Sequence, residues 1–415
     1  MRFELTTAQE HSHALSMSRK RILFMAESIT LAQIVRLRVL AGALDPMRYE
    51  VHFASGHFPQ LAFSDTQFER HELTVLDPKR AANAVAAGRR LYDSKALERY
   101  VRADLDLIER LRPEIVVGDF RLSLSTSAEL AGVHCAVLIN AYWSPFARDQ
   151  TVPVPDHPVI SLLGERLTER YFPKALPRAF EHFAAPVNEV RRRFGLEPIG
   201  SLRQVLTHAT TTLYPDHPGL TPLDAAPTNH VFLGPVLWAP NLPMPELRFE
   251  HAGRPLVYVT LGSSGRIDVL DKVVRALGGL QINAVVATAG RISVRSLPSN
   301  VAVADFVPGN ELARRASVVI TNGGSTTGYQ ALAEGTVVLG LPSNLDQFLA
   351  SRAITAAGGG VEVKARTLTQ TALTGALERC LRDTELRAAA QRIGHSFDEY
   401  DSSARFENWL QATCG

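Results

Sequence analysis

The chain has 415 residues, of which 46% are hydrophobic, and its 44 Lys and Arg residues nearly balance 42 Asp and Glu residues. This length exceeds what one compact core usually holds, so we expect two domains. The balanced charge gives the whole surface no bias toward polyanions and argues against nucleic acid as a partner. Cys135, Cys380 and Cys414 are too few and too scattered for a disulfide framework or a metal site, which favours a cytoplasmic location.

The sequence carries no sign of a membrane span or a signal peptide. No stretch approaches about 18 uninterrupted apolar residues, so membrane contact is predicted to be peripheral at most, for example through the three arginines at 191–193. Residues 1–18 are rich in Thr, His, Ser and Glu and lack an apolar core. We predict that they form a disordered tail.

Short apolar strands alternate with amphipathic helices in the first half of the chain. The predicted strands span 21–26, 49–54, 114–119 and 135–140. After the first of them, Leu37, Leu40, Ala41 and Leu44 recur at helical spacing and form one core-facing stripe. This alternation predicts a doubly wound α/β domain over residues 19–228.

A Pro-rich segment, 229–248, separates this half from the next and is predicted to be the interdomain linker. A second alternation follows it, with strands predicted at 256–262, 283–289, 301–306, 317–321 and 336–342. We therefore predict an α/β fold of two Rossmann-like domains, the second over 249–395, that face each other across a cleft. The last residues, 396–415, are expected to form a helix that packs back toward the first domain.

The most informative stretch is 317–360, where a glycine-rich turn follows one strand and an Asp-Gln pair follows the next. Gly323 and Gly324 let backbone N–H groups approach a phosphate, and the start of the following helix adds unpaired donors and a favourable dipole. Asp346 and Gln347 offer acceptors and an amide suited to sugar hydroxyls. This arrangement predicts a nucleotide-sugar site. The alternatives are an ordinary strand-to-helix turn, helix caps at Thr326 and Thr327, and a first-turn role for Asp346.

In open α/β sheets, ligands bind beyond the carboxyl ends of the strands. In the second half this rule selects Ser263, Ser264, Phe306, residues 322–327, Asp346 and Gln347. In the first half it selects residues 27–33, Asp119 and residues 140–143. The two sets are expected to face each other, with the donor on one side of the cleft and the acceptor on the other.

The stretch 317–360 resembles the donor-binding signature of the GT-B glycosyltransferases that use UDP- or dTDP-sugars, including the macrolide glycosyltransferases of secondary metabolism. LVYVTLGSSG at 256–265, ADFVPG at 304–309 and the opening segment at 21–44 are similar to further motifs of that family. The resemblance implies no metal or other cofactor. It implies donor contacts from Ser263, Ser264, Phe306, Val307, Asn322, Gly323, Gly324, Ser325, Thr326, Thr327, Gln330, Asp346 and Gln347.

Three positions depart from the family pattern. Asn322 replaces a phosphate-contacting His and cannot carry positive charge, and Gln330 replaces a ribose-binding Glu. Gln33 stands where a catalytic His is typical, and Gln cannot act as a base, a role that contributes on the order of a hundred- to ten-thousandfold. Asp119 matches the carboxylate that would orient that His. Asp119 or Glu27 could then be the base, or the acceptor could be acidic or a carbon nucleophile. The alternatives are that Asp119 caps the next helix and that Glu27 is a solvated loop residue.

Tyr142, Trp143 and Phe146 follow a strand and are predicted to form an aromatic acceptor wall, with a packed loop as the alternative. His208, His217 and His230 lack ligand spacing, so no metal site is predicted. The sequence thus predicts a transferase that moves a hexose from a UDP- or dTDP-sugar to a small hydrophobic or aromatic acceptor with inversion. Two alternatives are a nucleotide-sugar epimerase and a catalytically silent, donor-binding partner of another transferase.

Overall fold

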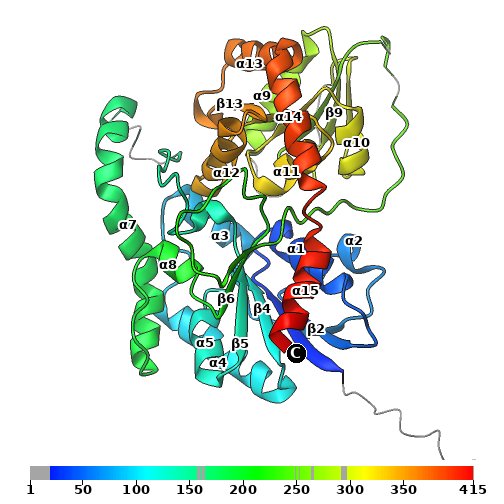
Figure 1. The fold of residues 1–415 in the computed structure, drawn as a ribbon. Coiled ribbons are helices and arrows are strands. Elements are labelled where there is room, and N and C mark those ends of the chain that lie inside the picture. Colours follow the sequence, from blue (N-terminus) through cyan, green and yellow to red (C-terminus); the bar gives the residue numbers. More distant parts are fainter. Residues whose placement is uncertain are drawn as a thin grey trace, which may run out of the picture.

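The computed structural model describes residues 19–156, 160, 164–247, 249–251, 253–262, 266–290 and 297–414. These residues form two units, each built on a parallel β-sheet, with the second unit above the first in Figure 1. The predicted fold of two doubly wound α/β units is confirmed. The predicted tail, 1–18, lies outside the described residues.

The first sheet has seven parallel strands in the order β3-β2-β1-β4-β5-β6-β7. The strands are β1 (Lys20–Ala26), β2 (Tyr49–Ser55), β3 (Glu69–Glu72), β4 (Ile115–Asp119), β5 (His134–Leu138), β6 (Thr211–Tyr214) and β7 (His230–Phe232). Sequence analysis predicted four of them and missed β3, β6 and β7. Because β7 pairs with β6, the predicted linker at 229–248 contains an edge strand of the first sheet.

The helices around the first sheet are α1 (Leu31–Gly42), α2 (Gln60–Phe63), α3 (Pro78–Ala86), α4 (Ser94–Leu111), α5 (Leu124–Ala131), η1 (Ala141–Trp143), α7 (Glu165–Arg193), α8 (Leu202–Leu206) and α15 (Ser402–Cys414). The predicted core-facing stripe is buried at Leu37, Leu40, Ala41 and Leu44, although α1 itself ends at Gly42. Charged side chains cap the starts of other helices; Asp93, for example, accepts from the Ala96 backbone N–H at the start of α4.

The second sheet has six parallel strands in the order β10-β9-β8-β11-β12-β13. The strands are β8 (Leu256–Thr260), β9 (Asn283–Ala287), β10 (Val301–Ala304), β11 (Val318–Thr321), β12 (Val337–Gly340) and β13 (Gly360–Glu362). The helices are α9 (Ile267–Gly278), α10 (Gly309–Arg315), α11 (Ser325–Ala333), α12 (Leu345–Ala356), η2 (Ala365–Thr367), α13 (Gln370–Arg382) and α14 (Thr384–Phe397). All five strands predicted for this half are present, and β13 was missed.

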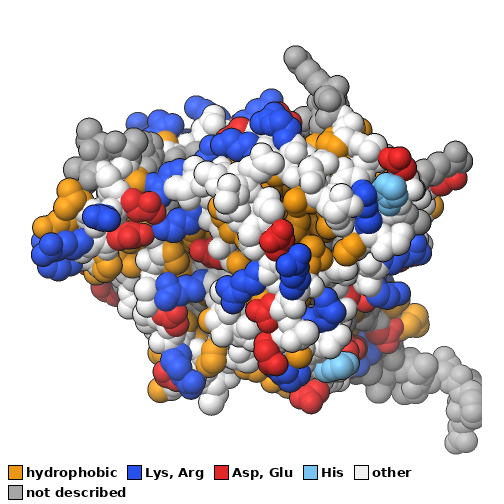
Figure 2. All heavy atoms as spheres, turned by 90° about the horizontal axis from the view of Figure 1, so that it is seen from above, with side chains coloured by type: hydrophobic (Ala, Val, Ile, Leu, Met, Phe, Trp, Pro, Cys, Tyr) orange, Lys and Arg blue, Asp and Glu red, His pale blue; other side chains and the backbone are white. Residues whose placement is uncertain are grey.

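The chain crosses back to the first unit at its end, where α15 packs against α1 (Figure 1). Phe406 and Leu410 are fully buried in one cluster with Ile22 and Phe24 of β1. The numerical domain boundaries stay predictions. Within the described part of the chain, no helix is both long and apolar enough to cross a bilayer. The face seen in Figure 2 mixes basic and acidic side chains rather than gathering one sign.

Candidate active site

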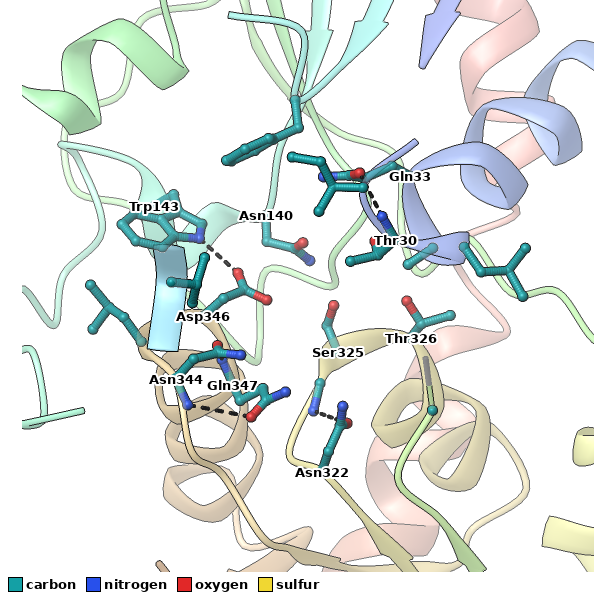
Figure 3. Close-up of a pocket in the computed structure, with 18 of the residues that line it drawn as sticks. Thr30, Gln33, Asn140, Trp143, Asn322, Ser325, Thr326, Asn344, Asp346 and Gln347 are labelled. Atoms are coloured by element: carbon teal, nitrogen blue, oxygen red, sulfur yellow. Dashed lines mark hydrogen bonds between the residues drawn. The ribbon is translucent and has the colours of Figure 1, made fainter. Parts of the chain in front are cut away.

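One cavity of about 850 Å³ lies between the two units and is lined by residues from both (Figure 3). We call the part formed by the second unit the polar end; its wall includes Thr260, Asn322, Gly324, Ser325, Thr326, Thr327, Gln330, Asn344, Asp346 and Gln347. We call the opposite part the apolar end; its wall includes Leu91, Leu97, Leu122, Phe172, Leu176, Phe180, Phe183, Val187, Leu202 and Leu206. The cavity therefore joins a hydrogen-bonding chamber to a hydrophobic one.

A glycine turn after β11 shapes the polar end. Gly323 has φ +82°, and a Cβ there would lie 3.0 Å from the Gln347 carbonyl oxygen and 3.2 Å from Pro342 Cβ, so only glycine fits. The turn is held from within, because Asn322 Oδ1 accepts from the Gly324 N–H at 3.1 Å. Gly323 is buried and does not itself line the cavity. Its role is to let the turn bring the next residues to the wall.

The N-terminus of α11 faces the cavity, where Ser325, Thr326 and Thr327 line the wall. The helix is preceded by Gly324, which offers no side-chain cap. Thr326 and Thr327 lie inside the first turn, so the helix-cap alternative is wrong. In Figure 3 the hydroxyl groups of Ser325 and Thr326 point into the cavity. Unpaired N–H groups, hydroxyls and the helix dipole together make this a place suited to an anion.

The start of α12 supplies the next part of the polar end. Asn344 Oδ1 accepts from the Gln347 N–H at 3.1 Å, and Gln347 Oε1 accepts from the Ser343 N–H at 3.0 Å. Gln347 thus helps to fix the helix start while it lines the cavity. Asp346 Oδ1 accepts from Trp143 Nε1 at 2.8 Å and from the Tyr142 hydroxyl at 3.1 Å, which ties this helix to the first unit.

The structure places the three residues of the predicted aromatic acceptor wall differently. Trp143 lines the cavity, whereas Tyr142 is buried and does not reach its wall. Phe146 packs edge-on against His230 with ring centroids 5.1 Å apart, as a packed loop would. The apolar wall comes instead from α7 and α8. These helices were not predicted; the apolar residues of α7 are interrupted by prolines and charges, and α8 has only five residues.

Asp119 lies beneath the cavity rather than on its wall. Arg36 donates through Nε and Nη2 to the two carboxylate oxygens, each at 2.9 Å, and Asp119 is fully buried. Burial raises the pKa of Asp119 to about 6, although Arg36 acts in the opposite direction. Gln33 Oε1 accepts from the Thr30 N–H at 3.1 Å and completes a capping box of α1. Among the described residues, Arg36 rather than Gln33 makes the side-chain hydrogen bonds to Asp119.

Asp119 does not cap the next helix either, since Ser123 precedes α5. A network of buried polar groups continues from Arg36 instead. Its Nη1 donates to Asn140 Oδ1 at 2.7 Å, Asn140 Nδ2 donates to Asp216 Oδ1 at 2.8 Å, and the Tyr329 hydroxyl donates to the same oxygen at 2.5 Å. Tyr329 belongs to α11, so the network joins the two units. The strand-end rule selects Asp216 once β6 is known, but that strand was not predicted.

Glu27 is also not on the cavity wall. It is fully buried, and its Oε2 accepts from Arg121 Nη1 at 2.9 Å. Arg121 also donates to Asp104 at 2.8 Å, and its guanidinium lies 4.2 Å from the Tyr100 ring centroid. Burial raises the pKa of Glu27 against the pull of Arg121. The prediction that Glu27 is solvated is wrong, and its ion pair with Arg121 gives it a structural role.

The remaining predicted donor residues lie at or near the polar end. Phe306 lines it with 43% of its surface exposed, and Val307 lines it beside the start of α10. Gln330 lines it and donates through Nε2 to the Trp238 carbonyl oxygen. Ser263 and Ser264 lie outside the described residues. Among the described lining residues, the carboxylates are Asp156, Asp305 and Asp346.

Two facing parallel sheets with a cavity between them, a glycine turn and a polar helix start are the arrangement that the resemblance to GT-B glycosyltransferases predicts. Residues 269–399 match the family model described as the C-terminal domain of erythromycin biosynthesis protein CIII-like proteins. The chain is 41% identical over 383 residues to a PGL/p-HBAD biosynthesis glycosyltransferase of Mycobacterium tuberculosis, covering 91% of this chain and 89% of the relative. It is 40% identical over 395 residues to a PGL/p-HBAD biosynthesis rhamnosyltransferase of Mycobacterium bovis, covering 95% and 88%.

Among solved structures, a spinosyn rhamnosyltransferase complexed with thymidine diphosphate has the same fold, with a TM-score of 0.67, 19% identity and coverage of 94% of this chain and all of that one. The chain therefore belongs to the family of the PGL/p-HBAD biosynthesis glycosyltransferases. It is a glycosyltransferase, and nothing in these relatives supports the epimerase alternative.

Proposed function

We propose that this glycosyltransferase moves a hexose or deoxyhexose from a dTDP- or UDP-sugar to the hydroxyl of a phenol that carries a large apolar substituent. The observation that carries the proposal is that one continuous cavity has a polar and an apolar end. The names of the relatives support it, since one is a rhamnosyltransferase and both belong to PGL, or phenolic glycolipid, biosynthesis. The thymidine diphosphate of the spinosyn enzyme supports a dTDP-sugar donor.

The polar end suits a nucleoside diphosphate sugar. Its anchor for the diphosphate is the start of α11 at Ser325, Thr326 and Thr327. Of the described residues that line this end, none is Lys or Arg, so the helix N-terminus supplies the positive potential. The same donors would stabilise the charge that develops on the leaving diphosphate. Phe306 offers a half-exposed ring to the base, and Gln330 offers an amide oxygen to the ribose.

The apolar end suits a hydrophobic acceptor. Phe172, Leu176 and Phe180 on α7 face the cavity together with Leu202 and Leu206 on α8. Burying an alkyl chain against such a wall contributes about 0.8 kcal/mol per methylene group. The acceptor hydroxyl would then lie where the two ends meet, near Gln33 and Asn140.

A phenolic acceptor also accounts for Gln33. A phenol has a pKa of about 10, as tyrosine does, so it needs less help from a base than an aliphatic alcohol. In the proposed step the phenol oxygen bonds to the anomeric carbon, the bond to the diphosphate breaks with inversion, and the phenol proton is released. Both carboxylates that were considered as alternative bases, Asp119 and Glu27, lie in buried ion pairs. This is consistent with an acceptor that ionises readily.

The proposal is tested by acceptor competition. The chain is incubated with dTDP-rhamnose, dTDP-glucose or UDP-glucose and with a long-chain ester of 4-hydroxybenzoate, its short-chain analogue or a long-chain alcohol, and product mass and diphosphate release are followed. We expect kcat/KM to be highest for the long-chain phenol and at least about tenfold lower for the alcohol. Equal rates with the alcohol, or a sugar isomer formed without any acceptor, would contradict the proposal.

Asp346 is proposed to hold sugar hydroxyls rather than the nucleotide. Asp346→Asn keeps an oxygen for Trp143 but removes the charge, so we expect dTDP-sugar affinity to fall about tenfold while dTDP affinity is kept. Asn322→Ala serves as the contrast, because it removes the oxygen that accepts from the Gly324 N–H. It should therefore lower the affinity for both dTDP and the dTDP-sugar. Calorimetry measures both affinities. Equal losses for the two ligands in Asp346→Asn would count against the assignment.

A further inference from the structure

A cluster of His and Glu side chains lies at the edge of the first sheet, outside the cavity. His52 on β2 pairs in register with Glu69 on β3, and His71 lies two residues further along β3, on the same face. His52 Nδ1 is 3.1 Å from His71 Nε2 and 3.4 Å from Glu69 Oε2, and His71 Nε2 is 3.8 Å from Glu69 Oε1. Two imidazole nitrogens and a carboxylate oxygen thus converge on one small space.

These separations match those of ligands around a tetrahedral ion. With metal-to-ligand distances of about 2.0 to 2.1 Å, two ligand atoms of a tetrahedral Zn²⁺ site lie about 3.3 to 3.4 Å apart. We propose that His52, His71 and Glu69 form a Zn²⁺-binding site, with a water molecule as the fourth ligand. The two imidazoles and one carboxylate are a ligand set that Zn²⁺ favours over Mg²⁺ or Ca²⁺.

The surroundings of the cluster support this assignment. Glu50 Oε1 lies 3.1 Å from His52 Nε2, the nitrogen on the far side of the ring from the cluster, as the outer carboxylate of a metal-bound His does. His52 is almost fully buried, while Glu69 is largely exposed and leaves a path for the ion.

The ion would fasten an edge strand. β3 has the sequence ERHE, none of whose side chains is buried, so hydrophobic packing does little to hold it on β2. A metal shared between His52 on β2 and two β3 residues would cross-link the strands at the exposed edge of the sheet. The three ligands do not line the cavity, so the site is structural and separate from glycosyl transfer.

The test uses the untagged full-length chain after chelator treatment. It measures Zn²⁺ affinity by competition with a chromophoric chelator, the visible spectrum with Co²⁺, and the melting temperature with and without Zn²⁺. We expect one equivalent of Zn²⁺ to bind with micromolar or tighter affinity, the strong visible bands of four-coordinate Co²⁺, and a higher melting temperature with Zn²⁺.

Variants distinguish Zn²⁺ binding at this site from weak Zn²⁺ binding at other histidines of the chain. His71→Ala and Glu69→Gln should each weaken Zn²⁺ binding by roughly 100-fold or more, and Glu50→Gln by about 10- to 100-fold. If His71→Ala folds poorly, Glu69→Gln still tests the proposal, because the Glu69 side chain is 62% exposed and its substitution should not disturb folding. His57→Ala, at an exposed histidine just after β2, is the matched control and should bind as the wild type does. No stoichiometric binding, a six-coordinate Co²⁺ spectrum, or equal affinities of Glu69→Gln and His57→Ala would overturn the proposal.

Discussion

The buried ion pair of Asp119 and Arg36 makes the stability of this protein depend on pH. The folded-state pKa of Asp119 is about 6, above its ordinary value of 3.8, because burial disfavours the carboxylate more than Arg36 favours it. The folded state therefore binds this proton more tightly than the unfolded state does. The resulting stabilisation is complete below the unfolded pKa and is lost as the pH rises through about 6.

Asp119→Asn should remove this dependence. The free energy of unfolding of the wild type minus that of Asp119→Asn is expected to fall by about 2 kcal/mol between about pH 4 and pH 7, from a shift of about two pKa units. Urea unfolding at each pH measures it. A difference that stays flat, or rises with pH, would show that Arg36 outweighs burial at this site.

Gln33 is predicted to act through the start of α1 rather than as a catalytic group. Gln33→Ala removes the side chain that accepts from the Thr30 N–H, which should cost about 1 kcal/mol of stability. Turnover of the phenol acceptor should fall by less than tenfold, whereas losing a base costs a hundredfold or more. Gln33→His alone should not create a His-carboxylate pair, because Arg36 holds both oxygens of Asp119. A hundredfold loss in Gln33→Ala, or a large gain in Gln33→His, would contradict this role.

At the scale of elements, the glycine turn between β11 and α11 offers a direct comparison of two substitutions. Gly323→Ala places a Cβ 3.0 Å from the Gln347 carbonyl oxygen at φ +82°, so it should lower stability by about 1 to 3 kcal/mol and weaken diphosphate binding. Gly375→Ala in α13 is the control, since nothing lies within 4 Å of its Cβ position and alanine favours a helix by about 1 kcal/mol. Thermal unfolding and dTDP titration measure both. If the dTDP affinity of Gly323→Ala were unchanged, the turn would not be part of the donor site.

Elements with a strong local signal were predictable, and those held by pairing alone were not. A β-branched run predicts β11, two glycines predict the turn after it, and helical spacing of apolar residues predicts α11. By contrast, β3 is short and polar, so its strand conformation depends on its neighbour β2 rather than on its own residues. The same contrast holds in the site. The strand-end rule placed Ser325 and Asp346 on the cavity wall, but the pairing of Arg36 with Asp119 joins residues 83 positions apart and has no local signature.

At the scale of the whole molecule, hydrogen bonds between polar side chains hold the two units together around the cavity. Tyr329 of α11 donates to Asp216 of the first unit, and Asp346 of α12 accepts from Trp143 and Tyr142. Both helices that shape the polar end are thus anchored to the opposite unit. A change in these contacts should therefore alter how the donor site faces the acceptor site.

Tyr329→Phe should loosen the two units without disturbing either core. It removes a hydrogen bond to a buried carboxylate, which is typically worth about 1.5 to 3 kcal/mol, and leaves the ring in place. We expect faster amide exchange both at the start of α11 and at residues 140–143, because the lost bond joined them through Asp216. Added dTDP-sugar should slow amide exchange more in Tyr329→Phe than in the wild type, since a ligand bound between the two units would replace part of the lost contact.

Tyr214→Phe is the matched control for this change. It also removes a buried tyrosine hydroxyl, but that hydroxyl bonds to Ser144 and His230, both within the first unit. We expect it to lower the melting temperature while leaving exchange in α11 as in the wild type. Two outcomes would mean that the bond between Tyr329 and Asp216 does not hold the units together. One is that amide exchange in α11 is as slow in Tyr329→Phe as in the wild type. The other is that it becomes equally fast in Tyr329→Phe and Tyr214→Phe. Loss confined to Tyr329→Phe would identify this bond as the contact that sets the donor helix against the acceptor domain.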